Sequence, residues 1–258
     1  MLALTLIRGR IAQAVLLIIV LAAIYLAAKI ASRRKLKTRG IPGLERLDHW
    51  IQQAAQLKRS VFFTPGTGAV TNSDTQAALA LLEHVAKQCA EHDVRLIVGT
   101  ADLNVHQVTE DIVKNAYTQA GKTEAFRTDT VRYISARQFA FAAGVMGLIQ
   151  RERTAVNIFV GDFAAESLEI AEAGRVEAIA QFGGTSNVTQ LPFFVTTCDQ
   201  TLIGEELYTA QGFLSKDPMV ISSLVGPDAG KILAMLLILA GALLVTYGDK
   251  ILVRLLTL

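Results

Sequence analysis

Two long apolar segments, one near each end of the chain, constrain the fold more than any other feature of the sequence. Residues 11–28 contain no charged side chain, and as a helix they would extend over roughly 27 Å, close to the thickness of a bilayer's hydrocarbon core. Residues 232–248 are also uncharged and would extend over about 25 Å, a length that the snorkelling side chain of Lys231 would increase. The sequence therefore predicts two transmembrane anchors, one within residues 1–32 and one within residues 227–258.

Each apolar segment has an alternative interpretation. The first could be a cleaved signal peptide, but such a peptide usually has a shorter apolar region and ends at small residues rather than at a basic cluster. The second could be a buried helix of a soluble domain, but its uniform apolar character leaves it without a polar face. A retained membrane anchor is the better interpretation of both segments.

The charged residues favour an orientation for these anchors. Residues 1–40 hold eight Lys and Arg and no acid, and six of the eight follow the first apolar segment. Because positive charge concentrates on the cytoplasmic side of membrane proteins, the region between the anchors is predicted to be cytoplasmic. Residues 41–230 hold 14 basic and 22 acidic side chains, so their net charge is −8. Such an acidic region argues against a nucleic-acid partner, and the lipid bilayer is the partner we expect.

Between the anchors, short runs rich in β-branched and aromatic residues alternate with amphipathic helical patterns. Strands are expected at 60–66, 94–100, 131–135, 155–162, 177–184, 192–199 and 220–226, and helices at 74–93, 104–121, 136–152, 163–174 and 203–215. This alternation predicts an α/β domain over residues 60–226, with a mostly parallel, Rossmann-like sheet covered by helices on both faces. A basic juxtamembrane stretch and an amphipathic linker helix at 44–59 are expected within residues 33–59.

Small, hydroxylated and acidic residues follow the predicted strands. In a parallel sheet, ligands bind beyond the carboxyl ends of the strands. The candidate residues of a ligand pocket at this edge are Thr64, Gly66, Gly68, Asp102, Asp162, Thr185, Ser186 and Asp199. The alternative is structural, because an aspartate after a strand is well placed to cap the N-terminus of the next helix.

Motifs for cofactor binding and catalysis are incomplete. Gly66, Thr67 and Gly68 form a G-x-G, but the third glycine of a dinucleotide fingerprint is replaced by Thr71. The four histidines lack metal-binding spacing, and the sequence contains no Ser, His and Asp set and no nucleophile elbow. We therefore expect no cofactor, no metal and no catalytic residue, and the sequence favours a protein without enzymatic activity.

One predicted helix is apolar on nearly all sides. Residues 139–149 are rich in small residues, with Gly144 and Gly147 three positions apart. A helix of this kind is buried either by its own domain or by a neighbouring subunit. The second possibility makes a homo-oligomer a realistic expectation.

Three runs of sequence, at 62–66, 138–168 and 190–215, resemble an uncharacterised family of prokaryotic membrane proteins known only as a domain of unknown function. The resemblance covers most of the chain and implies a cytoplasmic α/β domain between two anchors in a prokaryotic cell membrane. It carries no assigned activity. Its motif-like positions are Pro65, Gly66, Asp199, Glu205 and Glu206.

Three functions are compatible with these features. The first is a non-enzymatic, self-assembling scaffold or accessory component of a membrane protein complex at the cytoplasmic face. The alternative is a membrane sensor that binds a nucleotide or other small molecule at the carboxyl edge of the sheet. A membrane-bound hydrolase or transferase comes third, because the fold alone does not determine function.

Overall fold

The computed structural model describes residues 42–176 and 178–215, together with short helical stretches at 17–18, 20–22, 25–26, 29, 230–232, 234–236, 238–239, 241–243 and 246. The chain divides into two units, one formed by residues 39–215 and the other by the terminal segments 1–38 and 216–258. Within the described residues, no helix has both the length and the apolar character needed to cross a membrane. Most of both predicted anchors, and the predicted strand at 220–226, lie outside the described residues.

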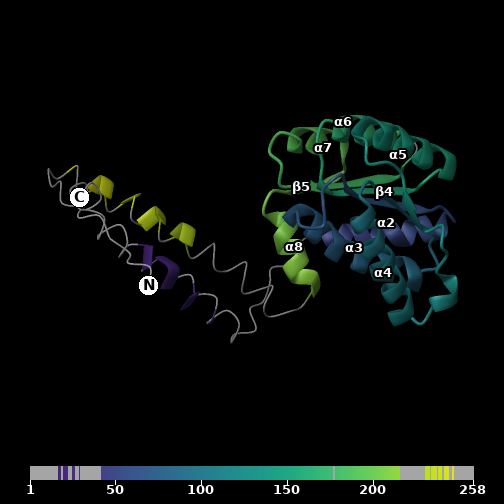
Figure 1. Cartoon of the computed structure of the whole chain (residues 1–258), viewed down its shortest axis with the longest axis horizontal. Coiled ribbons are helices and arrows are strands. Elements are labelled where there is room, and N and C mark those ends of the chain that lie inside the picture. The colour runs from purple at the N-terminus through teal and green to yellow at the C-terminus, as the bar shows by residue number, and fades with distance from the viewer. Residues whose placement is uncertain are drawn as a thin grey trace, which may run out of the picture. The chain divides into compact units, whose positions relative to one another are not determined.

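The central unit is an α/β domain, as predicted (Figure 1). In the described residues its strands are β1 (Val61–Gly66), β2 (Leu96–Thr100), β3 (Val131–Tyr133), β4 (Val156–Asp162), β5 (Ala180–Thr185) and β6 (Gln200–Ile203). Its helices are α2 (Pro42–Gln56), α3 (Ser73–Glu91), α4 (Leu103–Gln119), α5 (Gln138–Glu152), α6 (Glu166–Arg175), α7 (Leu191–Thr197) and α8 (Glu206–Ser215), with a 3₁₀ turn at Thr123–Ala125. All neighbouring strands pair in parallel, in the order β3-β2-β1-β4-β5-β6.

Helices cover both faces of this sheet, with α5, α6 and α7 on one side and α2, α3, α4 and α8 on the other (Figure 1). Every residue of β1, β2 and β5 is buried. Because both sides of each strand face a helix layer, the strands read as continuous apolar runs rather than as an alternating pattern. The core consequently forms two layers, one on each side of the sheet.

The helix predicted as a linker belongs to the domain core. In α2, the side chains of Leu44, Leu47, Ile51 and Ala54 are each no more than 3% exposed. Their spacing of three or four residues places them on one face of the helix, and that face packs against the same core layer as α3. The amphipathic pattern therefore marks a core-covering helix.

One predicted strand is wrong. Residues 192–199 were expected to be extended, but α7 occupies Leu191–Thr197 and the strand follows at Gln200–Ile203. Pro192 stands in the first turn of α7, where its missing N–H costs nothing, and Phe194 is fully buried against Phe163. A short apolar run does not distinguish a buried strand from a buried helix, so tertiary packing decided this segment.

Candidate functional site

The strand order defines a topological switch point between β1 and β4. From β1 the chain proceeds to β2 and β3 on one side, and it then crosses to β4 on the other side of β1. Helices that follow β1 and β4 therefore leave on opposite faces of the sheet. Ligands of doubly wound sheets bind at this position, at the carboxyl ends of the strands.

The ends of β1 and β4 approach each other closely enough to require glycine. Gly66 has φ +83° and Gly161 has φ +141°. A Cβ on Gly66 would lie 2.0 Å from the carbonyl oxygen of Asp162, and a Cβ on Gly161 would lie 2.0 Å from that of Pro65. The Thr67 N–H also donates to the Asp162 carbonyl at 2.9 Å. These backbone contacts fix the position of the Asp162 main chain, and therefore the point from which its carboxylate side chain extends.

The loop after β1 passes directly beside Asp162 and the first turn of α3. A Cβ on Gly68 would lie 2.5 Å from Thr75 Oγ1 and 2.9 Å from Asp162 Oδ2. Thr75 Oγ1 is fully buried and has no hydrogen-bond partner among the described residues. Asp162 Oδ2 accepts a hydrogen bond from Asn72 Nδ2 at 2.9 Å. Glycine at position 68 therefore lets the loop backbone pack directly against these two oxygens, where a side chain would collide with them.

A second carboxylate, Asp74, joins the end of β5 to α3 and α8. It is 3% exposed and accepts hydrogen bonds from the backbone N–H and the hydroxyl of Ser186, both at 2.8 Å. The Tyr208 hydroxyl also donates to Asp74, and the Thr185 hydroxyl lies 3.4 Å from it. Three segments far apart in the sequence are thus joined by one buried carboxylate.

A third carboxylate, Glu166, is fully buried at the start of α6. Its Oε1 accepts from the Thr67 hydroxyl at 2.9 Å and from the Ala164 N–H at 3.0 Å. Its Oε2 accepts from Gln138 Nε2 at 2.6 Å. The side chain therefore connects the β1 loop with α5 and α6 on the opposite face from α3.

The switch point is strongly acidic. Burial and the nearby charges of Asp74 and Glu166 raise the pKa of Asp162 above its ordinary value. None of the three carboxylates forms an ion pair with a basic side chain of the described residues, and the groups that donate hydrogen bonds to them are neutral amides, hydroxyls and backbone N–H groups. Within the described part of the chain, no three His, Cys, Asp or Glu side chains are grouped to hold a metal ion. The arrangement suits a ligand that donates hydrogen bonds or carries positive charge.

Most of the residues predicted for the pocket meet at this edge. Thr64, Gly66, Gly68 and Asp162 lie at the ends of β1 and β4 or in the loop between β1 and α3. Thr185 and Ser186 lie at the end of β5 and reach the same region through their hydrogen bonds to Asp74.

Asp102 and Asp199 have other roles. Asp102 caps α4, because its carboxylate accepts from the N–H groups of Asn104 at 2.8 Å and Val105 at 2.9 Å. Asp199 precedes β6 and accepts from the Gln181 N–H at 2.8 Å, so it lies at the amino end of its strand instead of the carboxyl edge. Asp199 was expected at the carboxyl end of a strand because residues 192–199 were predicted to form that strand.

The sequence reasoning missed Asp74, Glu166 and Tyr208. Both acids stand in the first turn of a helix, where acidic residues are common because they complement the helix dipole. Nothing local distinguishes a buried first-turn acid from an exposed one. The sequence feature that could have identified these three residues is their position, since each of them follows the end of a predicted strand within about a dozen residues.

Together, the fold and this site define a doubly wound α/β protein with an acidic cluster at its topological switch point. The chain belongs to the family described as Domain of unknown function (DUF6754), and the match covers residues 4–256. The match includes both terminal segments as well as the α/β domain, which agrees with the resemblance of most of the chain to an uncharacterised family. No curated protein and no solved structure matches the chain.

Proposed function

We propose that this protein is a membrane-anchored sensor that binds a small molecule at the switch point between β1 and β4. The observation that carries the proposal is the cluster of Asp74, Asp162 and Glu166, which brings three carboxylates together without a basic partner. Buried carboxylates without compensating charge are unfavourable for folding, and such groups are concentrated at functional sites.

The ligand class follows from the charge of this cluster. A phosphate group near the N-terminus of α3 would meet the carboxylates of Asp74 and Asp162, and like charges at this range repel. An amine or a polyol would instead supply donors to carboxylate oxygens, and charge-assisted hydrogen bonds of this kind are the stronger class. We therefore favour an amine-bearing or polyhydroxyl molecule over a nucleotide.

The membrane part of the proposal rests on the sequence. The two apolar segments are each long enough for a helix that spans a hydrocarbon core, and the basic residues at 29–39 follow the first of them. In this arrangement the α/β domain lies at the cytoplasmic face of a prokaryotic cell membrane, and ligand binding at the switch point would be transmitted to the anchors or to a membrane protein complex.

Thermal unfolding of the full-length chain in a neutral detergent, followed by the fluorescence of the single tryptophan Trp50, tests the binding site. A library of amines, amino sugars and polyols is screened beside a set of nucleotides. A ligand present at about one hundred times its Kd should stabilise the protein by about 2.7 kcal/mol.

Two asparagine variants locate the binding. Asp162→Asn should abolish most of the stabilisation by the ligand. Asp102→Asn removes the same charge at the same edge and keeps the cap of α4, so it should bind as the wild type does. Stabilisation by nucleotides alone, or equal effects of the two variants, would contradict the proposal.

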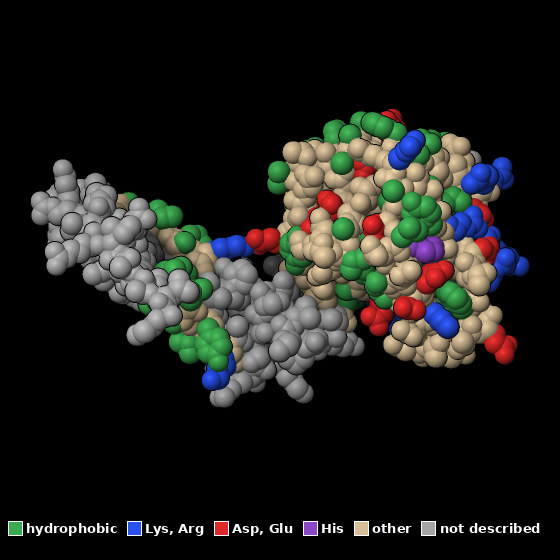
Figure 2. All heavy atoms as spheres, viewed as in Figure 1, with side chains coloured by type: hydrophobic (Ala, Val, Ile, Leu, Met, Phe, Trp, Pro, Cys, Tyr) green, Lys and Arg blue, Asp and Glu red, His purple; other side chains and the backbone are tan. Residues whose placement is uncertain are grey.

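A second candidate function, self-assembly as a scaffold, is favoured by exposed apolar side chains on the α5–α7 face. Phe139 is 65% exposed, Leu168 37% and Val195 50%, and they lie on three adjacent helices. Figure 2 shows hydrophobic side chains on this surface over α6 and α7. Exposed apolar groups gathered on one face of a domain are typical of a subunit contact.

Native mass spectrometry of the detergent-extracted chain tests this second function. A discrete homo-oligomer is expected, and Phe139→Ser combined with Val195→Ser should reduce its copy number. Leu57→Ser is the matched control, because Leu57 is 51% exposed and follows α2 on the other side of the sheet. A strictly monomeric wild type would eliminate the scaffold function.

A further inference from the structure

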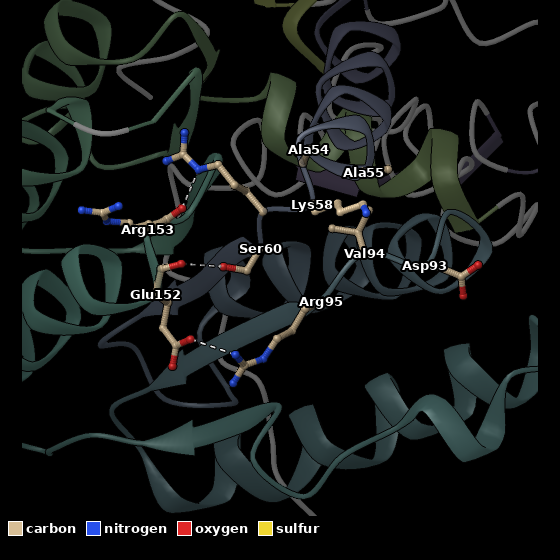
Figure 3. Close-up of a pocket in the computed structure, with 10 residues that line it drawn as sticks. Ala54, Ala55, Lys58, Ser60, Asp93, Val94, Arg95, Glu152 and Arg153 are labelled. Carbon is tan, nitrogen blue, oxygen red and sulfur yellow. Dashed lines mark hydrogen bonds and ion pairs between the residues drawn. The ribbon is translucent and has the colours of Figure 1, made fainter.

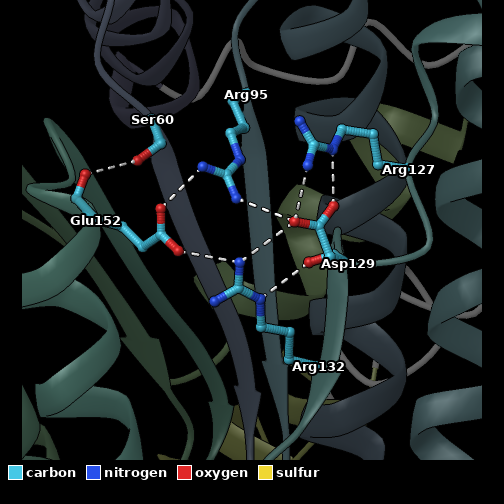
Figure 4. A network of polar contacts seen from close by, with 6 residues as sticks. All are labelled: Ser60, Arg95, Arg127, Asp129, Arg132 and Glu152. Carbon is cyan, nitrogen blue, oxygen red and sulfur yellow. Dashed lines mark hydrogen bonds and ion pairs between the residues drawn. The ribbon is translucent and has the colours of Figure 1, made fainter.

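Polar and charged contacts cross-link the amino edge of the sheet, at the opposite ends of the strands from the switch point. Immediately before β1, the Ser60 hydroxyl donates to the main-chain carbonyl of Glu152 at 3.3 Å, and immediately before β2, Arg95 forms an ion pair with the Glu152 carboxylate at 2.9 Å (Figure 3). Arg132 in β3 contacts the same carboxylate at 3.0 Å (Figure 4). Asp129, which precedes β3, contacts Arg95 at 3.2 Å. Movement in response to the switch point is therefore expected at the carboxyl ends of the strands and in the helices that follow them.

Helix α8 follows the carboxyl end of β6 and is the last described helix of the α/β domain. From its end the chain continues into residues 216–258, which contain the second apolar segment. Gly204, between β6 and α8, has φ +57°, and a Cβ at this position would meet no atom within 4 Å. A glycine in this left-handed and uncrowded turn gives the start of α8 freedom to move.

Tyr208 joins α8 to the first turn of α3. Leu207 and Ala210 are each 1% exposed and pack α8 against the core layer that contains α3. Between them, the Tyr208 hydroxyl donates to Asp74 Oδ1 at 2.5 Å and lies 3.2 Å from the Ser73 hydroxyl. Asp74 is only 3% exposed in this arrangement, so docked α8 helps to keep water from its carboxylate.

The side chain of Asn72, the N-cap of α3, links Asp74 to Asp162. Asn72 Oδ1 accepts a hydrogen bond from the Asp74 N–H at 2.8 Å, and Asn72 Nδ2 donates to Asp162 Oδ2 at 2.9 Å. Burial, and then the charge of Asp74, raise the pKa of Asp162 above its ordinary value. The two carboxylates are thus held close enough to repel each other.

The position of α8 changes the strength of this repulsion. With α8 docked, the charge of Asp74 is shielded from water, and the repulsion by Asp162 acts through a medium of low dielectric constant. When α8 opens, water reaches Asp74 and screens its charge. A negative charge on Asp162 therefore favours the opening of α8, and its neutralisation favours docking.

We propose that Asp74 and Tyr208 couple the charge of Asp162 to the docking of α8 on α3. The inference rests on the proposed function, in which a small molecule binds at the switch point. A ligand tightens α8 in this way only if it neutralises Asp162, so the coupling selects a cationic amine over an uncharged polyol. Because coupling between two sites is reciprocal, docking of α8 raises the affinity for the amine by the same factor. The response of α8 is passed directly to the chain that follows it.

Amide hydrogen exchange of the full-length chain in a neutral detergent, read by mass spectrometry, tests the coupling without a ligand. Asp162→Asn replaces the carboxylate with a neutral amide of the same shape, and it should slow exchange in residues 206–215 about threefold. The matched control is Asp102→Asn, which removes one charge from the same edge of the sheet and should leave exchange in α8 unchanged.

Two further variants assign the effect to Asp74 and Tyr208. In an Asp74→Asn background, Asp162→Asn should no longer slow exchange in α8, because the second charge is gone. Tyr208→Phe keeps the ring and removes the hydroxyl that donates to a carboxylate, so exchange in α8 should become about tenfold faster. Thr209→Val removes a hydroxyl from the neighbouring exposed position and should exchange as the wild type does.

Three results would each overturn the coupling: unchanged exchange of α8 in Asp162→Asn, equal slowing in the Asp74→Asn background, or wild-type exchange in Tyr208→Phe. The ligand site itself is tested separately by the thermal screen. A screen without a stabilising compound, together with the expected exchange pattern, would contradict the sensor function and support the coupling. A stabilising amine, together with unchanged exchange of α8 in Asp162→Asn, would support the sensor function and overturn the coupling.

Discussion

Replacing Gly68 with alanine is expected to destabilise the α/β domain by about 1–3 kcal/mol, because the new methyl group has no space. Its carbon would lie 2.5 Å from Thr75 Oγ1, 2.7 Å from Asp162 Cβ and 2.9 Å from Asp162 Oδ2, well inside the 3.4 Å at which ordinary contact begins. Thr75 is fully buried in α3, and the Cβ of Asp162 cannot move without its strand. The β1 loop must therefore shift away from the switch point.

Urea unfolding of the full-length chain, followed by Trp50 fluorescence, measures this cost. Trp50 lies in α2 and packs against the core layer that contains α3, so it reports on the α/β domain. In a thermal experiment, each kcal/mol corresponds to a change of about 2–4 °C in the Tm of a domain of this size.

Gly147→Ala is the matched control, since a Cβ at Gly147 would meet no atom within 4 Å. Gly147 lies inside α5, where alanine is favoured over glycine by up to about 1 kcal/mol, so this variant should be more stable than the wild type. If Gly68→Ala unfolds within about 0.5 kcal/mol of the wild type, the close approach of the loop to Asp162 is wrong.

Four further outcomes follow from the structure. Asp162→Asn should raise the Tm at pH 7 more than at pH 4. The pKa of Asp162 is raised in the folded protein, so the wild type loses stability as the pH rises above the ordinary carboxyl range. Differential scanning calorimetry at both pH values measures this difference. Asp102→Ala should cost about 1 kcal/mol in urea unfolding through loss of the α4 cap. Burial raises the pKa of Cys198 to about 12 and that of Cys89 further, so iodoacetamide at pH 7.5 should label neither thiol before unfolding, as read by mass spectrometry. Lys58→Gly should raise stability by roughly 0.5–1 kcal/mol by relieving the left-handed backbone, measured in the same urea titration.

The sequence predicted most of the individual helices and strands, but it did not predict which of them lie next to one another. The strands at β1, β2 and β4 and the helices α3, α4 and α5 lie within a few residues of their predicted bounds. Their patterns are local, because a buried strand needs β-branched and aromatic residues along its whole length and a covering helix needs one apolar face. The α7 segment failed for the same reason, since a short buried helix and a short buried strand have the same composition.

The candidate site was predictable in part. Gly66, Gly68 and Asp162 were found because they follow strands, and parallel strands bring their carboxyl ends to one edge. Asp74 was missed because its partner Ser186 lies 112 positions away in the sequence. Position after a strand also selected Asp102, and only the hydrogen bonds of its carboxylate distinguish a helix cap from a pocket residue.

By itself, the sequence determined the α/β class of the domain, the parallel arrangement of its strands, the glycines of the β1 loop and the two apolar terminal segments. These properties follow from composition and periodicity, which each segment carries independently of the others. Only the tertiary structure decided the strand order β3-β2-β1-β4-β5-β6, and with it the switch point where Asp74, Asp162 and Glu166 meet. The physical reason is that strand order and long-range contacts depend on which buried surfaces fit one another, and no single segment carries that information.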